Sequence, residues 1–217
     1  MLKKRLLIVI GCLIGLIIAS ISIKYAFDHL VDQTKWMGLA IGVIFMLAGI
    51  LAMILAKYLP ILYLLSFVLN MIGVGLSITA YYVLKAYSLE LVDFAVAIAV
   101  SIGVLAGFSA LSVIPIFKKH HKLFASIVII ISFLSSLTLW LSVDKFTGLS
   151  FYFLNVTYFF IVTIIRSTDS LDDVARELAV ASIGAFILIS IIVFIILSEG
   201  ESLSLDLPVG SRKKKKG

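Results

Sequence analysis

The sequence is poor in cysteine, proline and charge. Cys12 is the only cysteine among 217 residues, which excludes an intrachain disulfide and any metal site built from several thiolates. Charged residues make up only 14% of the chain, and none lies near the middle of a long apolar run. Proton-coupled antiporters and voltage sensors generally need an ionisable group at that depth, so the lack of one argues against both classes.

Recognisable catalytic motifs are also missing. The sequence has no His-Glu-x-x-His zinc motif, no Gly-x-Ser-x-Gly nucleophile elbow and no pair of aspartates within an apolar run. Cys12 has no ionisable neighbour in its apolar run that would activate it as a nucleophile. We therefore assign no catalytic, cofactor-binding or metal-binding residue, and the sequence favours a protein without enzymatic activity.

What the chain has in abundance is apolar side chain. Hydrophobic residues make up 62% of the sequence and the mean hydropathy is +1.21, well outside the range of soluble domains. A helix needs roughly 20 apolar residues to cross the hydrocarbon core of a bilayer. Runs that approach or exceed this length cover 6–23, 37–56, 60–84, 91–117, 123–143, 147–165 and 178–197. These runs predict an all-α, polytopic transmembrane bundle with seven spans.

Prolines and polar or aromatic residues near the ends of the runs refine this prediction. Pro60 favours a tight hairpin between the second and third runs over one long broken helix, because proline fits the first turn of a helix. Pro115 predicts that the fourth helix ends or kinks before Lys118. We expect one bundle domain over 1–198 and a flexible polar tail over 199–217 that ends in a lysine cluster. Aromatic residues typical of a membrane interface fall near the predicted span ends: Tyr25, Trp36, Tyr58, Tyr81, Tyr82, Tyr87 and Trp140.

The orientation follows from the excess of lysine and arginine in cytoplasmic loops. With the N-terminus inside, that side holds nine basic residues: Lys3, Lys4, Arg5, Lys57, Lys118, Lys119, Lys122, Arg166 and Arg176. The other side holds four: Lys24, Lys35, Lys85 and Lys145. This favours a cytoplasmic N-terminus in a bacterial-type cytoplasmic membrane. Seven spans put the five basic residues of the tail outside, which evens the count, so six crossings with one re-entrant run stay an alternative.

Glycine pairs four residues apart occur in three of the runs. Such a pair forms a groove on one helix face in which another backbone can pack closely. The pairs are Gly11 with Gly15, Gly38 with Gly42, and Gly103 with Gly107. We expect most of them to pack within one bundle, while a homo-oligomer or a partner membrane subunit is the alternative occupant.

Polar side chains inside the apolar runs are candidates for either helix contacts or a substrate site. They are Asn70, Ser77, Thr79, Ser101, Ser132, Ser135, Ser136, Asn155, Thr157 and Ser190. The amides of Asn70 and Asn155 are the costliest to place in lipid, so we expect both to face the bundle interior or a cavity. Hydrogen bonding between helices is the favoured interpretation, and a polar substrate pathway is the alternative.

The acidic residues of the loops are better explained as helix caps than as metal ligands. Asp93, together with Glu90, lies in a first helical turn after Ser88, where carboxylates complement the helix dipole. Ser170 and Asp173 fit a capping box ahead of the last run, with Asp172 in its first turn. A divalent-cation site that includes Asp169 is the alternative for this loop.

Basic residues at the predicted cytoplasmic side suggest a lipid partner. His120 and His121 are adjacent, so they do not share one helix face as a metal pair would. We expect anionic lipid headgroups to contact Lys3, Lys4, Arg5, Lys118, Lys119 and Lys122, and we expect no nucleic-acid partner.

Three function classes stay open at this point. The first is a small permease or the membrane subunit of a transport or export system, with a cavity lined by Asn70 and Asn155. The second is a membrane scaffold or regulator that acts through helix contacts and anionic lipids. The third and weakest is an intramembrane enzyme.

Overall fold

The protein is described by a computed structural model that covers residues 2–30, 35–84, 89–141, 145–166 and 174–205. Over these residues the chain forms helices and no strands, which confirms the predicted all-α class for the described part. In chain order the helices are α1 (Leu2–Leu30), α2 (Lys35–Leu55), α3 (Leu62–Leu84), α4 (Leu91–Leu111), α5 (Pro115–Lys119), α6 (His121–Leu141), α7 (Lys145–Arg166) and α8 (Val174–Leu205).

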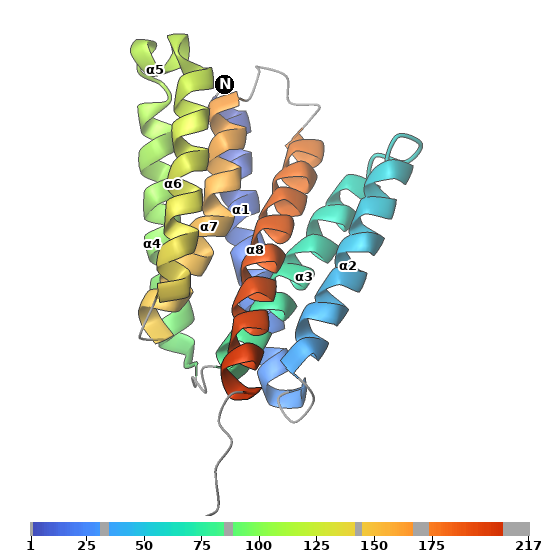
Figure 1. Ribbon diagram of the computed structural model, residues 1–217. Helices are drawn as coiled ribbons and strands as arrows, with labels where there is room; N and C mark the ends of the chain where they lie inside the picture. The colour runs from blue at the N-terminus through green and yellow to red at the C-terminus, as the bar shows by residue number, and fades with distance from the viewer. Residues whose placement is uncertain (1, 31–34, 85–88, 142–144, 167–173, 206–217) are drawn as a thin grey trace, which may run out of the picture.

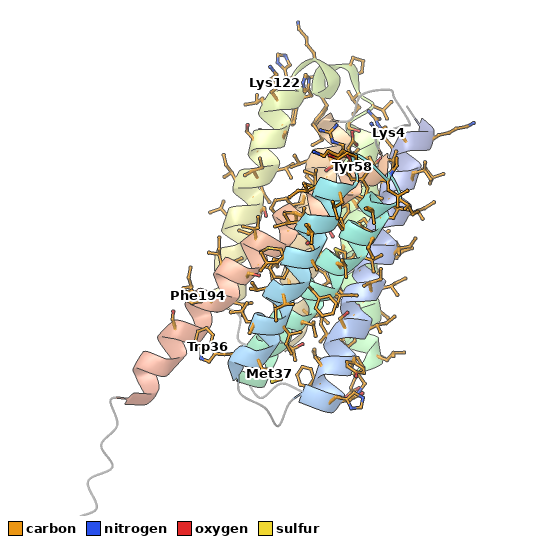
Figure 2. All side chains as sticks on the ribbon, turned by 90° about the vertical axis from the view of Figure 1, so that its right-hand side faces the viewer. Lys4, Trp36, Met37, Tyr58, Lys122 and Phe194 are labelled. Atoms are coloured by element: carbon orange, nitrogen blue, oxygen red, sulfur yellow. The ribbon has the colours of Figure 1, made fainter. Side chains whose placement is uncertain are left out.

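The long helices lie side by side and alternate in direction along the chain. Figure 1 shows the N-terminus at one end of the bundle and the end of α8 at the other. Lys4, Tyr58 and Lys122 mark the first end in Figure 2, and Trp36 and Met37 lie toward the opposite end. The sequence analysis assigned a set of basic residues to the cytoplasmic side. Those that the structure describes therefore lie at helix ends, and these helix ends meet at one end of the bundle.

Five helices are long and apolar enough to cross a membrane within the described residues. These candidate spans are Lys3–His29, Trp36–Leu55, Leu62–Thr79, Leu91–Leu111 and Val174–Ile195. Two shorter apolar stretches, His121–Ser132 and Tyr152–Ile165, occur in α6 and α7. The outer face of the bundle is also apolar: on α1, for example, Ile10, Ile14, Ile17 and Ile21 are all exposed. An exterior of this kind is stable in lipid and not in water, which supports an integral membrane protein.

The predicted hairpin between the second and third runs is confirmed as the α2–α3 pair. Residues 56–61 form the turn, and the Tyr63 amide at the start of α3 donates to the Pro60 carbonyl at 3.1 Å. The two backbones approach very closely at two glycines: a Cβ atom added to Gly42 would lie 2.9 Å from the Gly73 carbonyl oxygen, and the reverse is also true. Dispersion and weak hydrogen bonds hold such a pair where lipid supplies no hydrophobic driving force.

The core of the bundle forms where α1, α3, α7 and α8 meet. On α1 the fully buried side chains recur at helical spacing, as Ile8, Cys12 and Leu16 show. The Tyr152 hydroxyl of α7 donates a hydrogen bond to the Val74 carbonyl of α3. This bond satisfies a phenol that would be costly to bury alone in an apolar core.

The fourth helix ends earlier than its apolar run. We predicted a helix over 91–117, but α4 ends at Leu111, with Ser112 as its C-cap. Pro115 begins the short α5 instead, in the first position where its missing N–H costs nothing. At the start of α4, the Glu90 amide donates to the Asp93 carboxylate at 2.8 Å, so Asp93 caps the helix as expected, while Ser88 lies outside the described residues.

Candidate functional site

Asn155 joins two helices through its amide oxygen. Its Oδ1 atom accepts hydrogen bonds from the Ser135 hydroxyl at 2.9 Å and the Ser132 hydroxyl at 3.2 Å. All three side chains are buried, and they connect α7 to α6. The arrangement matches the expectation of an interhelical hydrogen bond.

Asn70 lies against the α2–α3 interface. Its Nδ2 atom donates to the Ser66 carbonyl at 2.7 Å, one turn earlier on α3. A Cβ atom at Gly49 of α2 would come within 2.8 Å of the Asn70 amide, so the glycine makes room for this side chain. Neither Asn70 nor Asn155 lines any of the three cavities described below.

Two basic residues near the start of α1 point into the bundle. The Lys4 ammonium forms an ion pair with the Glu177 carboxylate at 2.8 Å, and the Lys4 side chain is only 2% exposed. Arg5 is also buried, and its Nη2 atom lies 3.4 Å from the Ser112 carbonyl oxygen. The start of α1 is thereby tied to α8 and to the end of α4, while the Lys3 side chain is exposed.

The described residues form a groove between α6 and α8. In Figure 1, α7 lies between these two helices, and they make few contacts with each other. Three adjoining cavities of about 490, 430 and 120 Å³ occupy the groove, and Ile129 and Val162 line all three. We call this feature the α6–α8 groove. Its lining residues are His121, Lys122, Ala125, Ser126, Ile129, Ser132, Tyr158, Phe159, Val162, Thr163, Arg176, Glu177, Val180, Ala181, Gly184 and Leu188.

The lining of the groove changes from polar to apolar along its length. Lys122 and Arg176 lie in the first turns of α6 and α8, at the end of the bundle that also holds Lys4. Further along, the walls are Ile129, Val180 and Leu188. A site with charge at one end and hydrocarbon along the rest is complementary to an amphiphile.

Gly184 shapes the floor of the groove. A Cβ atom at this position would meet the Phe159 ring at 2.7 Å, so the glycine lets the ring lie against α8. Lys122, Ser132 and Arg176 were named from the sequence for other reasons, but the groove that they line was not predicted. The signal was present on α8, where Arg176, Val180, Gly184 and Leu188 recur every four residues and therefore share one face.

The remaining sequence predictions have mixed outcomes. His120 and His121 are exposed at the α5–α6 junction. Asp169, Asp172 and Asp173 lie outside the described residues, as do the side chains of Lys118 and Ser136. Within the described part of the chain, no group of three or more His, Cys, Asp or Glu side chains could hold a metal ion.

The glycine pairs differ in their surroundings. Gly11 and Gly15 pack against side chains of α8 and α3, as expected for a bundle. An added Cβ at Gly103 or Gly107 would instead meet nothing within 4 Å, so this pair faces outward from α4.

Comparison with protein-family models, with curated proteins and with solved structures gave no match. The function proposed below therefore rests on the geometry of this chain.

Proposed function

We propose that this protein is a seven-span membrane protein that takes an amphiphilic molecule from the bilayer into the α6–α8 groove, as a small permease or as the membrane subunit of a transport or export system. The observation that carries the proposal is the groove itself, with Lys122 and Arg176 at one end and apolar walls along the rest. An amphiphile can enter such a site sideways without leaving lipid.

Helix lengths support seven crossings. α6 has 21 residues and α7 has 22, and α2 and α4 have 21 each. At about 1.5 Å per residue these helices are about 30 Å long, which equals the hydrocarbon thickness of a bilayer. The basic residues at the N-terminal end of the bundle support a cytoplasmic N-terminus, and this places the polar end of the groove at the cytoplasmic leaflet.

The type of substrate follows from where the polar side chains are. Asn70 and Asn155 hydrogen-bond to serine residues on their own or neighbouring helices, and neither lines a described cavity. A water-soluble substrate would need polar groups along its path, while an amphiphile needs them at one end only. The groove therefore favours amphiphilic over water-soluble substrates.

A scaffold or regulator is the second candidate function. The two asparagines favour it, because they stabilise contacts within the bundle. In this case the protein would act through its helix surfaces and would not take a ligand into the groove.

Cysteine access distinguishes the candidates. In a Cys12→Ala background, a spin label at Ile129→Cys should collide with oxygen dissolved in lipid and be restricted when a spin-silent amphiphile is added. A label at Ile130→Cys, whose native side chain is similarly exposed but lines no described cavity, is the matched control. Labels that respond identically at both positions would contradict a ligand groove.

A second labelling experiment tests whether an aqueous pathway for a polar substrate passes through the bundle. Cysteines at Asn70 and Asn155 should be closed to a small water-soluble thiosulfonate, because both side chains are fully buried. Rapid modification at either position would mean an aqueous pathway through the bundle and would contradict an amphiphile-specific groove.

A further inference from the structure

The geometry points to an anionic phospholipid of the cytoplasmic leaflet as the occupant of the α6–α8 groove, with its phosphate held between Lys122 and Arg176. This inference rests on the proposed function and adds the chemical class of the ligand. It assigns a binding role to Arg176, which the sequence analysis counted only as a basic residue of the predicted cytoplasmic side.

The charge at the polar end of the groove is positive. Lys122 and Arg176 line adjoining cavities and both are exposed, so their cationic groups are available to a ligand. Among the described residues of the lining, Glu177 is the one that is acidic, and the Lys4 ammonium pairs with its carboxylate at 2.8 Å. Each lysine or arginine near a membrane surface contributes attraction to anionic lipid, so Lys122 and Arg176 favour an anionic headgroup over a neutral one.

Two helix starts reinforce this positive end. α6 begins at His121 and α8 at Val174, so both helices direct their N-terminal dipole toward the same end of the bundle as Lys122 and Arg176. Unpaired N–H groups at a helix start and the partial positive charge of the dipole both favour a phosphate. Ser126 and Thr163 also line this part of the groove, and their hydroxyls donate to the Lys122 and Phe159 carbonyls of their own helices at 3.1 and 2.9 Å.

The length of the groove fits one leaflet. Along α8, the distance from Arg176 to Leu188 is about 18 Å at about 1.5 Å per residue. Half of the hydrocarbon core is about 15 Å thick. An acyl chain whose phosphate sits at Arg176 would therefore extend past Val180 and Ile129 to the region of Leu188, where the lining is almost entirely apolar.

The apolar part of the groove can be blocked at a defined position. Ile129 lines all three cavities, and its side chain is 56% exposed. Ile130 is 59% exposed on the same helix but lines none of the three cavities. Ile129→Trp should fill the groove, while Ile130→Trp adds the same bulk to the outer surface.

The test uses the full chain, purified and stripped of lipid in detergent, with binding followed by native mass spectrometry. Phosphatidylglycerol and phosphatidylcholine with identical acyl chains are the two probes. We expect tighter binding of phosphatidylglycerol. Lys122→Ala and Arg176→Ala should each weaken the binding of phosphatidylglycerol about fivefold, and the double variant should weaken it about twenty-five-fold. Lys57→Ala with Lys119→Ala removes two exposed cations from the same end, outside the groove, and should change binding little.

The outcomes separate the two proposals. Equal affinity for both lipids, or an equal loss in the Lys57→Ala, Lys119→Ala control, would overturn the assignment of an anionic headgroup. If Ile129→Trp still blocked both lipids and Ile130→Trp did not, the groove and the proposed function would stand without that assignment. If the two tryptophan variants bound lipid equally well, both proposals would be wrong.

Discussion

The Lys4 ammonium of α1 donates to the Glu177 carboxylate of α8 at 2.8 Å, across 173 positions of sequence. The Lys4 side chain is almost fully buried, and the Glu177 side chain is about one quarter exposed, although its second carboxylate oxygen is buried. This pair fixes the start of α1 against the first turn of α8, and it neutralises the only acidic residue among the described residues of the groove lining.

Removing one partner of this pair should destabilise the bundle. Lys4→Met leaves the carboxylate without its counter-ion, and we expect a loss of about 2 kcal/mol, less than for a fully buried pair because Glu177 is partly exposed. The double variant Lys4→Met with Glu177→Leu should recover much of that loss. Unfolding of the purified chain in mixed micelles, analysed as a double-mutant cycle, measures the coupling. Additive losses would mean that the two groups do not interact.

Glycine-to-alanine changes should separate packed from unpacked glycines. A Cβ atom at Gly75 would press against the Ala19 carbonyl of α1, so Gly75→Ala should cost about 1–3 kcal/mol. Gly103→Ala meets open space and replaces a poor helix former, so stability should be unchanged or rise by up to about 1 kcal/mol. Thermal unfolding of both variants in the same detergent makes the comparison. Equal losses would contradict the packing described here.

The Asn155 amide should contribute to stability and not to an aqueous pathway. Asn155→Leu deprives the Ser132 and Ser135 hydroxyls of their shared acceptor. We expect a loss of about 1 kcal/mol, the usual size for a hydrogen bond between membrane helices. Lipid binding in the groove should persist, because Asn155 does not line it. Ser101→Ala is the control, since the Ser101 hydroxyl has no partner among the described residues and its removal should cost less.

The class of fold could be predicted from sequence because lipid imposes one rule on every residue that it surrounds. Backbone groups in hydrocarbon must be paired within the segment, so long apolar runs become helices. Pro60 located the α2–α3 hairpin for a similarly local reason. The end of α4 was less predictable, since apolar residues continue past Leu111 and only Pro115 signals that the helix has stopped.

The groove could not be predicted, because it depends on which helices become neighbours. Lys4 and Arg5 looked like surface cations, yet their position beside α8 and α4 buries them. The same motif also has different surroundings at Gly11 and Gly103, since one faces Leu178 and the other faces open space. Helical spacing marks the faces of a helix, but it does not tell which partner covers each face.

The location of the C-terminus tests the central claim most directly. Seven crossings with a cytoplasmic N-terminus put the two ends of the chain on opposite sides of the membrane, and they put the polar end of the groove at the cytoplasmic leaflet. A reporter fused after Gly217 that signals differently on each side should report the outer side, and one fused before Met1 should report the cytoplasm. If both reporters signalled from the cytoplasm, the chain would cross an even number of times and the seven-span account would be wrong.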